Sequence, residues 1–236
     1  MKKYILWLAG ILVVVGLLVF IAKANAETKA LKVVHSSSYY PYSYFNEKQE
    51  PTGLLIDFWK LWSEKNKVDI EISLHDWNQA LQMVKDGEAD IVGGAFLTEA
   101  RKPYFDFSEP IMRVKTGVFV FDKLPINKMV DLETYEVGVI KGDYAEEYLQ
   151  VNYPFLKLKT FANIEEIFKA LESQELKAFT MDYNDDTLAT IYLKFAFIKN
   201  YKLLEAIISS EYRAAVKKGS LDLVELVNKG IDKSTP

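Results

Sequence analysis

The chain has 236 residues, of which 50% are hydrophobic and 26% charged, so it can bury the core of one large domain or two small ones. A formal net charge of −4 gives it no basic footprint for nucleic acid. It contains no cysteine and only two histidines, which excludes disulfides, thiolate metal sites, a cysteine nucleophile and a lipid-modified cysteine, and argues against a histidine-rich metal site.

Residues 1–26 predict an export segment. Lys2 and Lys3 precede an uncharged run over 4–22, and the small residues Ala24 and Ala26 suit signal-peptide cleavage after Ala26. The run is also long enough to nearly span a bilayer, so an uncleaved membrane anchor stays open as the alternative. In both cases the lysines favour the cytoplasmic side, and the rest of the chain is expected to be exported to the periplasm.

From residue 31 on, short β-branched runs alternate with segments whose apolar residues recur at helical spacing. The predicted strands are 31–36, 69–74, 89–94, 135–140, 156–161 and 176–182. The predicted helices are 53–66, 77–87, 143–150 and 163–173. This alternation predicts an α/β fold with βαβ units and a mostly parallel sheet. The order strand, helix, strand occurs twice, which suggests two similar lobes.

Two extended runs, 116–121 and 211–218, connect these lobes, and a final helix is predicted from Ser220. A chain that leaves one lobe, builds a second and returns has a two-stranded hinge and a cleft. The expected domains are an export or anchor segment 1–26, lobe 1 over 27–119 plus 212–236, and lobe 2 over 120–211.

The segment GGAFLTEARKPYFDFSEP, residues 93–110, places a cation at an unusual position. Thr98 is predicted to open a short helix with Arg101 in its first turn, where the helix dipole disfavours a positive charge. Either Asp106 or Glu109 neutralises this arginine, or its guanidinium is available for an anionic ligand.

Ligands in open α/β sheets bind at the carboxyl ends of the strands. In this chain the predicted strand ends carry Gly94, the pair 142–143 and Asp182. Asp182 could alternatively belong to a polar loop that caps the next helix. A cation site at Asp182, Asp185 and Asp186 is disfavoured because no further ligands follow at suitable spacing.

Six segments resemble those of the family 3 bacterial extracellular solute-binding proteins, the periplasmic amino-acid-binding type. In chain order between residues 31 and 230 they are YPYSYFNEKQEPTGLLIDFWK, DWNQALQMVKDGEADIVGG, LTEARK, DFSEP, VGVIKGDYAEEYL and AFTMD. The resemblance implies a Venus-flytrap fold that closes over an amino acid or a similar small polar solute.

The resemblance also implies roles for individual residues. Arg101, the hydroxyl of Thr98 and backbone amides would hold the ligand carboxylate, and a planar guanidinium suits this task. Asp182 would hold the α-ammonium group. The rings of Tyr42 and Trp77 would pack on the ligand side chain, although either ring could instead belong to the core.

The turn Gly142-Asp143-Tyr144 matches a helix N-terminus that offers amides to the carboxylate, and here Asp143 and Tyr144 are candidate site residues. Two positions depart from the family. Phe96 stands where many amino-acid binders have serine or threonine, and Asp143 stands where threonine or serine is frequent. Asp143 is reasonable as a helix cap with Glu146 but would repel an anion. An apolar or aromatic amino acid is therefore favoured.

The sequence thus predicts a periplasmic solute-binding protein that captures an amino acid or similar small carboxylate by hinge closure for an ABC-type transporter. The alternative is the extracellular sensing domain of a signalling system, which the run SSEYRAAVKKGSLDLVELVNKGIDK resembles more closely. A chain truncated at its C-terminus stays open. A dehydratase-like enzyme on the same fold is the third reading, and no enzymatic activity is expected.

The expected partners are the small-molecule ligand and either a membrane permease or a sensor partner. No cofactor, metal or nucleic acid is expected, and the membrane is contacted only through residues 4–22 if the N-terminal segment is retained. The protein is expected to be a monomer.

Overall fold

The computed structural model describes residues 30–234. The predicted export or anchor segment 1–26 lies outside the described residues. Within residues 30–234, no helix is both long and apolar enough to cross a membrane.

The main sheet has eight strands. Their bounds are β1 Leu31–Ser36, β5 Ile70–His75, β6 Ile91–Phe96, β7 Phe105–Phe121, β8 Glu136–Ile140, β9 Lys157–Phe161, β10 Ala178–Tyr183 and β11 Tyr201–Lys217. Their order in the sheet is β5-β1-β6-β11-β7-β10-β8-β9. β1 pairs in parallel with β5 and β6, and β8 pairs in parallel with β9 and β10. The sheet therefore has one mostly parallel group of strands on each side of β7 and β11.

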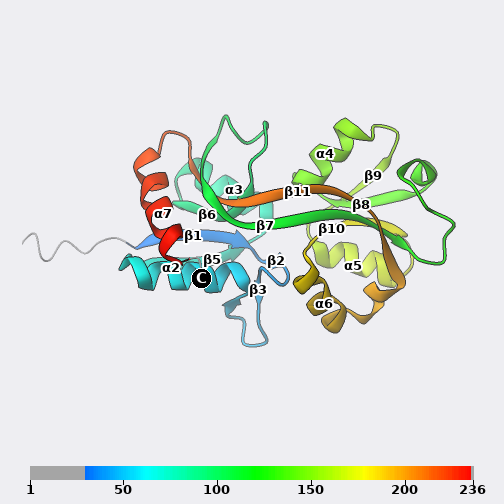
Figure 1. Cartoon of the computed structure of the whole chain (residues 1–236), viewed down its shortest axis with the longest axis horizontal. Coiled ribbons are helices and arrows are strands. Elements are labelled where there is room, and N and C mark those ends of the chain that lie inside the picture. The colour runs from blue at the N-terminus through cyan, green and yellow to red at the C-terminus, as the bar shows by residue number, and fades with distance from the viewer. Residues whose placement is uncertain (1–29, 235–236) are drawn as a thin grey trace, which may run out of the picture. The chain divides into compact units, whose positions relative to one another are not determined.

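The two long strands β7 and β11 lie side by side and pair antiparallel along nearly their whole length (Figure 1). One end of β11 also pairs with β6, and β7 pairs with β10 over residues 115–120. Both strands thus belong to both halves of the sheet. The predicted lobe boundaries after residues 119 and 211 fall inside them and stay predictions.

Helices pack against each half of the sheet (Figure 1). Their bounds are α2 Leu54–Asn66, α3 Trp77–Asp86, α4 Tyr144–Asn152, α5 Ile164–Glu172, α6 Asp185–Lys194 and α7 Leu221–Ser234. Short 3-10 helices span η1 Met129–Leu132 and η2 Ala196–Asn200, and a small second sheet holds β2 Ser38–Tyr39, β3 Ser43–Phe45 and β4 Pro51–Thr52. Helices α2, α3 and α7 belong to the half that contains β1, and α4, α5 and α6 to the half that contains β8.

Local signals set several helix ends. The side chain of Asn163 accepts a hydrogen bond from the backbone of Glu166 and so caps α5, as the sequence predicts. Gly87 ends α3 in the left-handed region at φ 82°, a conformation that costs glycine little. Asp143 caps α4 by accepting from the amide of Tyr144.

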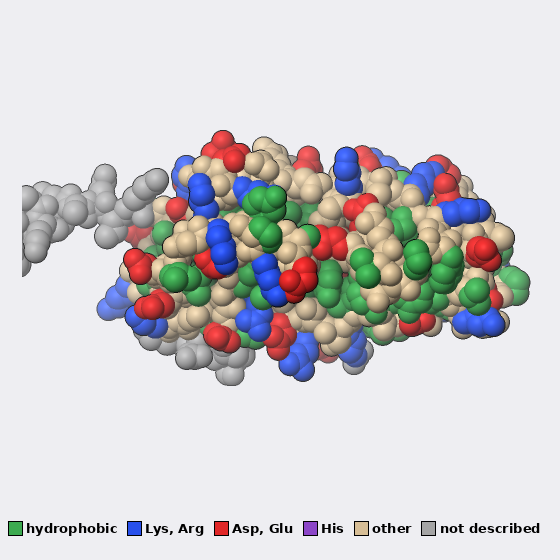
Figure 2. All heavy atoms as spheres, turned by 90° about the horizontal axis from the view of Figure 1, so that it is seen from above, with side chains coloured by type: hydrophobic (Ala, Val, Ile, Leu, Met, Phe, Trp, Pro, Cys, Tyr) green, Lys and Arg blue, Asp and Glu red, His purple; other side chains and the backbone are tan. Residues whose placement is uncertain are grey.

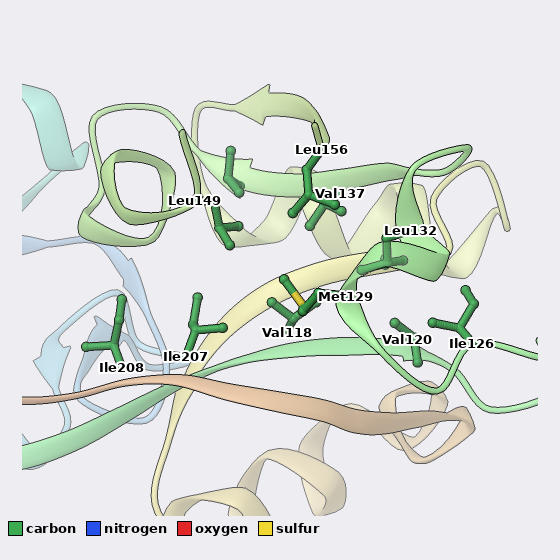
Figure 3. Close-up of a cluster of buried hydrophobic side chains, with 12 residues drawn as sticks. Val118, Val120, Ile126, Met129, Leu132, Val137, Leu149, Leu156, Ile207 and Ile208 are labelled. Carbon is green, nitrogen blue, oxygen red and sulfur yellow. The ribbon is translucent and has the colours of Figure 1, made fainter. Parts of the chain in front are cut away.

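Each half buries its own apolar core. In the second half the side chains of Val118, Val137 and Leu149 converge from β7, β8 and α4 (Figure 3). In the first half Trp59 and Trp62 of α2 are fully buried between the sheet and α7. Burying such side chains supplies the main drive for folding.

The short helix predicted at Thr98 is absent, and residues 99–104 form turns instead. The amides of Arg101 and Lys102 both donate to the carbonyl of Thr98, which closes a single turn. The helix does not continue because Pro103 has no amide hydrogen and β7 begins at Phe105. The helix-dipole argument for Arg101 therefore does not apply.

The crossing strands are longer than predicted, since each begins about ten residues before its predicted start at 116 or 211. Pro110 and the alternating charges around it conceal the first part of β7, and long-range pairing with β11 supplies the strand. The sequence left open a polar loop around Asp182 that caps a following helix, and helix α6 begins at Asp185. The side chain of Asn184 caps α6 by accepting from the amide of Thr187. In return, the hydroxyl of Thr187 accepts from the amide of Asn184.

On the face shown in Figure 2, acidic and basic side chains are interspersed and no large basic patch gathers. This distribution agrees with the small net charge of −4. That face offers no stripe of positive charge of the kind that binds nucleic acid.

Candidate functional site

A cavity of about 60 Å³ lies where the two halves of the sheet meet. Residues from both halves line it: Ser38, Tyr39 and Trp77 come from the first, and Asp143, Thr180 and Asp182 from the second. The volume is enough for a few water-sized groups. Because β6, β8 and β10 end nearby, the cavity occupies the place that open α/β sheets use for ligands.

Asp182 lies near the end of β10 and is 9% exposed. Its carboxylate accepts a hydrogen bond from the hydroxyl of Tyr39 at 2.8 Å and another from the hydroxyl of Thr116. Burial and the neighbouring charge of Asp143 raise the pKa of Asp182 to about 7, although both hydroxyl donors favour the ionised form. Two hydroxyl groups hold the carboxylate in place, but its negative charge is energetically unfavourable in this buried position.

Asp143 joins Asp182 in the cavity lining. One of its oxygens accepts from the amide of Tyr144 at 2.7 Å, so the same carboxylate caps α4 and faces the cavity. Burial raises the pKa of Asp143, and the positive charge of Arg101 opposes that rise. Two acids thus repel each other across one small space, which is an arrangement that a cationic group relieves.

Arg101 is 5% exposed and does not line the cavity. Its guanidinium donates to the backbone carbonyl of Phe96 at 3.0 Å and to that of Gly142 at 3.1 Å. It also lies 5.2 Å from the centre of the Trp77 ring. The hydrogen bond to Gly142 connects the turn after β6 to the turn before α4, so Arg101 bridges the two halves.

Asp106, one of the two surface partners considered for Arg101, is engaged elsewhere. The carboxylate of Asp106 pairs with Lys218 and accepts from the amide of Gly219. Arg101 is instead buried among backbone carbonyls.

Three buried polar atoms lack a hydrogen-bond partner among the described residues: Nε2 of His35, Oγ of Ser38 and Nε1 of Trp77. All three residues line the cavity. Burial lowers the pKa of His35 to about 3, so its ring is neutral at physiological pH. A buried polar atom without a partner costs about 1–3 kcal/mol, and a ligand that bonded to it would recover that cost.

Tyr39 is the centre of an aromatic stack beside the cavity. Its ring centre lies 4.6 Å from that of Tyr42 and 5.6 Å from that of Tyr212. Tyr42 is fully buried and shares a hydrogen bond of 3.2 Å with the hydroxyl of Thr187. The stack fixes the hydroxyl of Tyr39 toward Asp182.

The structure brings together four of the nine residues predicted for the site in the cavity lining: Trp77, Gly94, Asp143 and Asp182. The other five, Tyr42, Phe96, Thr98, Arg101 and Tyr144, do not line it. Phe96 is 1% exposed and packs edge-on against Tyr212 with ring centres 4.4 Å apart. All nine assignments as ligand contacts stay predictions.

The sequence interpretation missed several lining residues, namely His35, Ser38, Tyr39, Thr116, Thr180 and Tyr212. His35 lies near the carboxyl end of the first predicted strand and Ser38 just beyond that end, which was the available signal. Among the residues described by the structure, no group of three or more histidine, aspartate or glutamate side chains is placed to hold a metal ion.

A sequence profile of the bacterial extracellular solute-binding proteins, family 3, matches residues 31–235. A probable histidine-binding protein of Neisseria gonorrhoeae is 26% identical over 219 residues, which make up 90% of this chain and 80% of that protein. A solved ancestral arginine-binding protein bound to glutamine has a TM-score of 0.77 and 28% identity, and the match covers 86% of this chain and 91% of that one.

A second kind of relative is a signalling protein. The virulence sensor protein BvgS of Bordetella pertussis is 22% identical over 212 residues. These residues make up 87% of this chain but only 17% of the sensor. The same kind of domain therefore occurs both in binding proteins and within a much larger sensor.

Proposed function

Because the chain belongs to the bacterial extracellular solute-binding proteins, family 3, we propose that it captures a small solute of the amino-acid class by closing two lobes over the cavity. The observation that carries this proposal is the buried carboxylate of Asp182 in a cavity lined from both halves of the sheet. A buried acid of this kind attracts the amino group that such solutes share.

The proposed lobes are 27–119 plus 212–236 and 120–211, joined by β7 and β11. Hinge closure needs a ligand that makes more contacts in the closed form than in the open one. Asp182 and Asp143 stand on the second lobe, whereas Ser38 and Trp77 stand on the first. A ligand in the cavity would touch both lobes only when they are closed, which gives it the required difference in affinity.

Two relatives support two different roles for solute binding, one in transport and one in sensing. The histidine-binding relative favours delivery to a membrane permease of the ABC type after export, with the protein as a periplasmic monomer. The BvgS relative favours the second candidate, a sensing domain whose closure is read by a signalling partner. A retained N-terminal segment would anchor a sensor, so the mass of the N-terminal peptide of the exported protein distinguishes the two. We propose no catalytic step.

Isothermal titration tests the proposal. The exported protein is unfolded and refolded to remove any carried ligand, and is then titrated with the twenty amino acids and their common amine derivatives. We expect at least one of these solutes to bind, since a micromolar dissociation constant corresponds to about −8.2 kcal/mol, within reach of charged anchors in a buried site. A folded sample that binds no member of the panel would contradict the proposal.

A further inference from the structure

The charges that face the cavity are of one sign. Of the described residues that line it, Asp76, Asp143 and Asp182 are acids and none is lysine or arginine. His35 is neutral because burial lowers its pKa to about 3. The lining therefore suits a cation and repels an anion.

Arg101 is buried near the cavity but does not line it. Arg101 donates to the carbonyls of Phe96 and Gly142, and the charge of Asp143 partly cancels its own. A ligand carboxylate that approached Arg101 would also approach the carboxylate of Asp143. Like charges repel strongly in a desolvated site, so this approach is opposed.

Neutral groups in the lining carry no positive charge with which to pair a carboxylate. The indole of Trp77, one of the three buried atoms without a partner, can only donate, and hydroxyls such as that of Ser38 can donate or accept. The carboxylates of Asp143 and Asp182 are acceptors when ionised. An ammonium group has three hydrogens to donate, which matches these acceptors.

Part of the lining is apolar. The half of the molecule that carries Asp182 contributes large apolar side chains to the lining, namely those of Ile140, Ile164, Phe168, Ile191 and Phe195. Phe96, which led us to expect an apolar ligand, is not part of this surface. The apolar wall is supplied by other residues and suits a hydrocarbon body attached to the ammonium group.

From this arrangement we propose that the site selects primary amines with an apolar body and no carboxylate, in preference to the corresponding amino acids. Asp143 is the residue that sets this preference, because it places a negative charge beside Arg101. The inference rests on the proposed function and specifies which solutes related to the amino acids the site prefers.

The test compares amino acids with the amines that lack only their carboxylate. The refolded, exported protein is titrated at pH 8.5 with phenylalanine and 2-phenylethylamine, and with leucine and 3-methylbutylamine. We expect each amine to bind at least about tenfold more tightly than its amino acid. Equal or tighter binding of the amino acids overturns the inference and leaves the proposed function standing. A folded sample that binds neither series overturns the inference, and the proposed function is then decided separately by the full panel of amino acids and amines.

A pair of variants connects the preference to Asp143. Asp143→Asn keeps a good helix cap, so the fold is retained, but removes the charge beside Arg101. We expect the amine-to-amino-acid affinity ratio to fall by about tenfold in this variant. Glu147→Gln removes a neighbouring charge that also acts on Asp143 but does not line the cavity, and should leave the ratio within about twofold of the wild type. An unchanged ratio in Asp143→Asn would overturn the assignment.

Discussion

The hydroxyl of Tyr39 in β2 donates a hydrogen bond of 2.8 Å to the carboxylate of Asp182 in β10. The two residues are 143 positions apart in the sequence and belong to different sheets, since β2 lies in the small three-stranded sheet and β10 in the eight-stranded one. The bond therefore connects the two sheets at the acid that is proposed to hold the ligand. Its strength depends on the protonation of Asp182, because a hydrogen bond to a charged acceptor contributes more than one to a neutral acceptor.

Tyr39→Phe should therefore destabilise the protein more at pH 8.5, where Asp182 is ionised, than at pH 5, where it is protonated. We expect a loss of about 1.5–3 kcal/mol at the higher pH and a smaller loss at the lower pH. Denaturant unfolding at both pH values measures this difference.

A matched control is Tyr153→Phe. It removes a tyrosine–carboxylate hydrogen bond of similar length, 2.7 Å, from Tyr153 to Glu205, and neither residue lines the cavity. The loss in this control does not involve Asp182, so it reports what a tyrosine–carboxylate bond contributes away from the cavity. Equal losses from Tyr39→Phe at both pH values would show that the bond from Tyr39 contributes no more to ionised than to protonated Asp182.

The stability of the ligand-free protein should fall as the pH rises through the titration of Asp182. Its pKa is raised from 3.8 in the unfolded chain to about 7 in the folded state. Between these values the folded state binds more protons than the unfolded state, so the free energy of unfolding decreases as the pH rises. The contribution is complete below about pH 4 and is lost above about pH 7.

Asp182→Asn isolates this contribution from those of the other acids. The difference in free energy of unfolding between the variant and the wild type, measured from pH 4 to pH 8, should shift in favour of the variant as the pH rises. A difference that stays constant over this range would mean that Asp182 keeps an ordinary pKa in the folded protein.

Local signals in the sequence predict most of the fold. The alternation of strands and helices is confirmed, as are the family resemblance and the two-lobed α/β fold. These features follow from hydrophobic period and capping residues, as at Asn163. The full length of β7 was not predictable, because Pro110 and nearby charges mask its first part, which pairs with β11 far along the chain.

The site was only partly predictable for a similar reason. Strand ends led to Gly94, Asp143 and Asp182, which all line the cavity. The position of Tyr39 depends on stacking between Tyr42 and Tyr212, and such long-range contacts have no periodic signature in the sequence. The resemblance assigned Arg101 to a carboxylate, and this assignment stays a prediction; in the structure its Nη1 and Nη2 each donate to a backbone carbonyl.

Arg101→Gln should weaken both the fold and the affinity for any ligand that needs closure. The variant loses charged donors to the carbonyls of Phe96 and Gly142, and a hydrogen bond from a charged donor contributes about 1.5–3 kcal/mol. It also removes the positive charge that holds down the pKa of Asp143, so that pKa should rise. Denaturant unfolding and carboxyl chemical shifts from NMR would measure the two effects. An unchanged titration of Asp143 would contradict the electrostatic part of this account.

Gly93→Ala in β6 should displace the ring of His35, which lines the cavity. A methyl group there would lie 2.1 Å from Cε1 of His35 and 2.7 Å from Nε1 of Trp59, so both rings would have to move. Trp59 also donates to the carbonyl of Gly93 at 2.7 Å, which restricts its movement. We expect a loss of about 1–3 kcal/mol in the free energy of unfolding, as for other overpacked cores.

A double-mutant cycle with His35→Ala separates the two clashes. If the contact with His35 dominates, Gly93→Ala should cost at least about 0.5 kcal/mol less in the His35→Ala background than in the wild type. Unfolding of the four proteins in denaturant measures this coupling. An equal cost in both backgrounds would assign the clash to Trp59, whose indole would then be the feature that requires glycine at position 93.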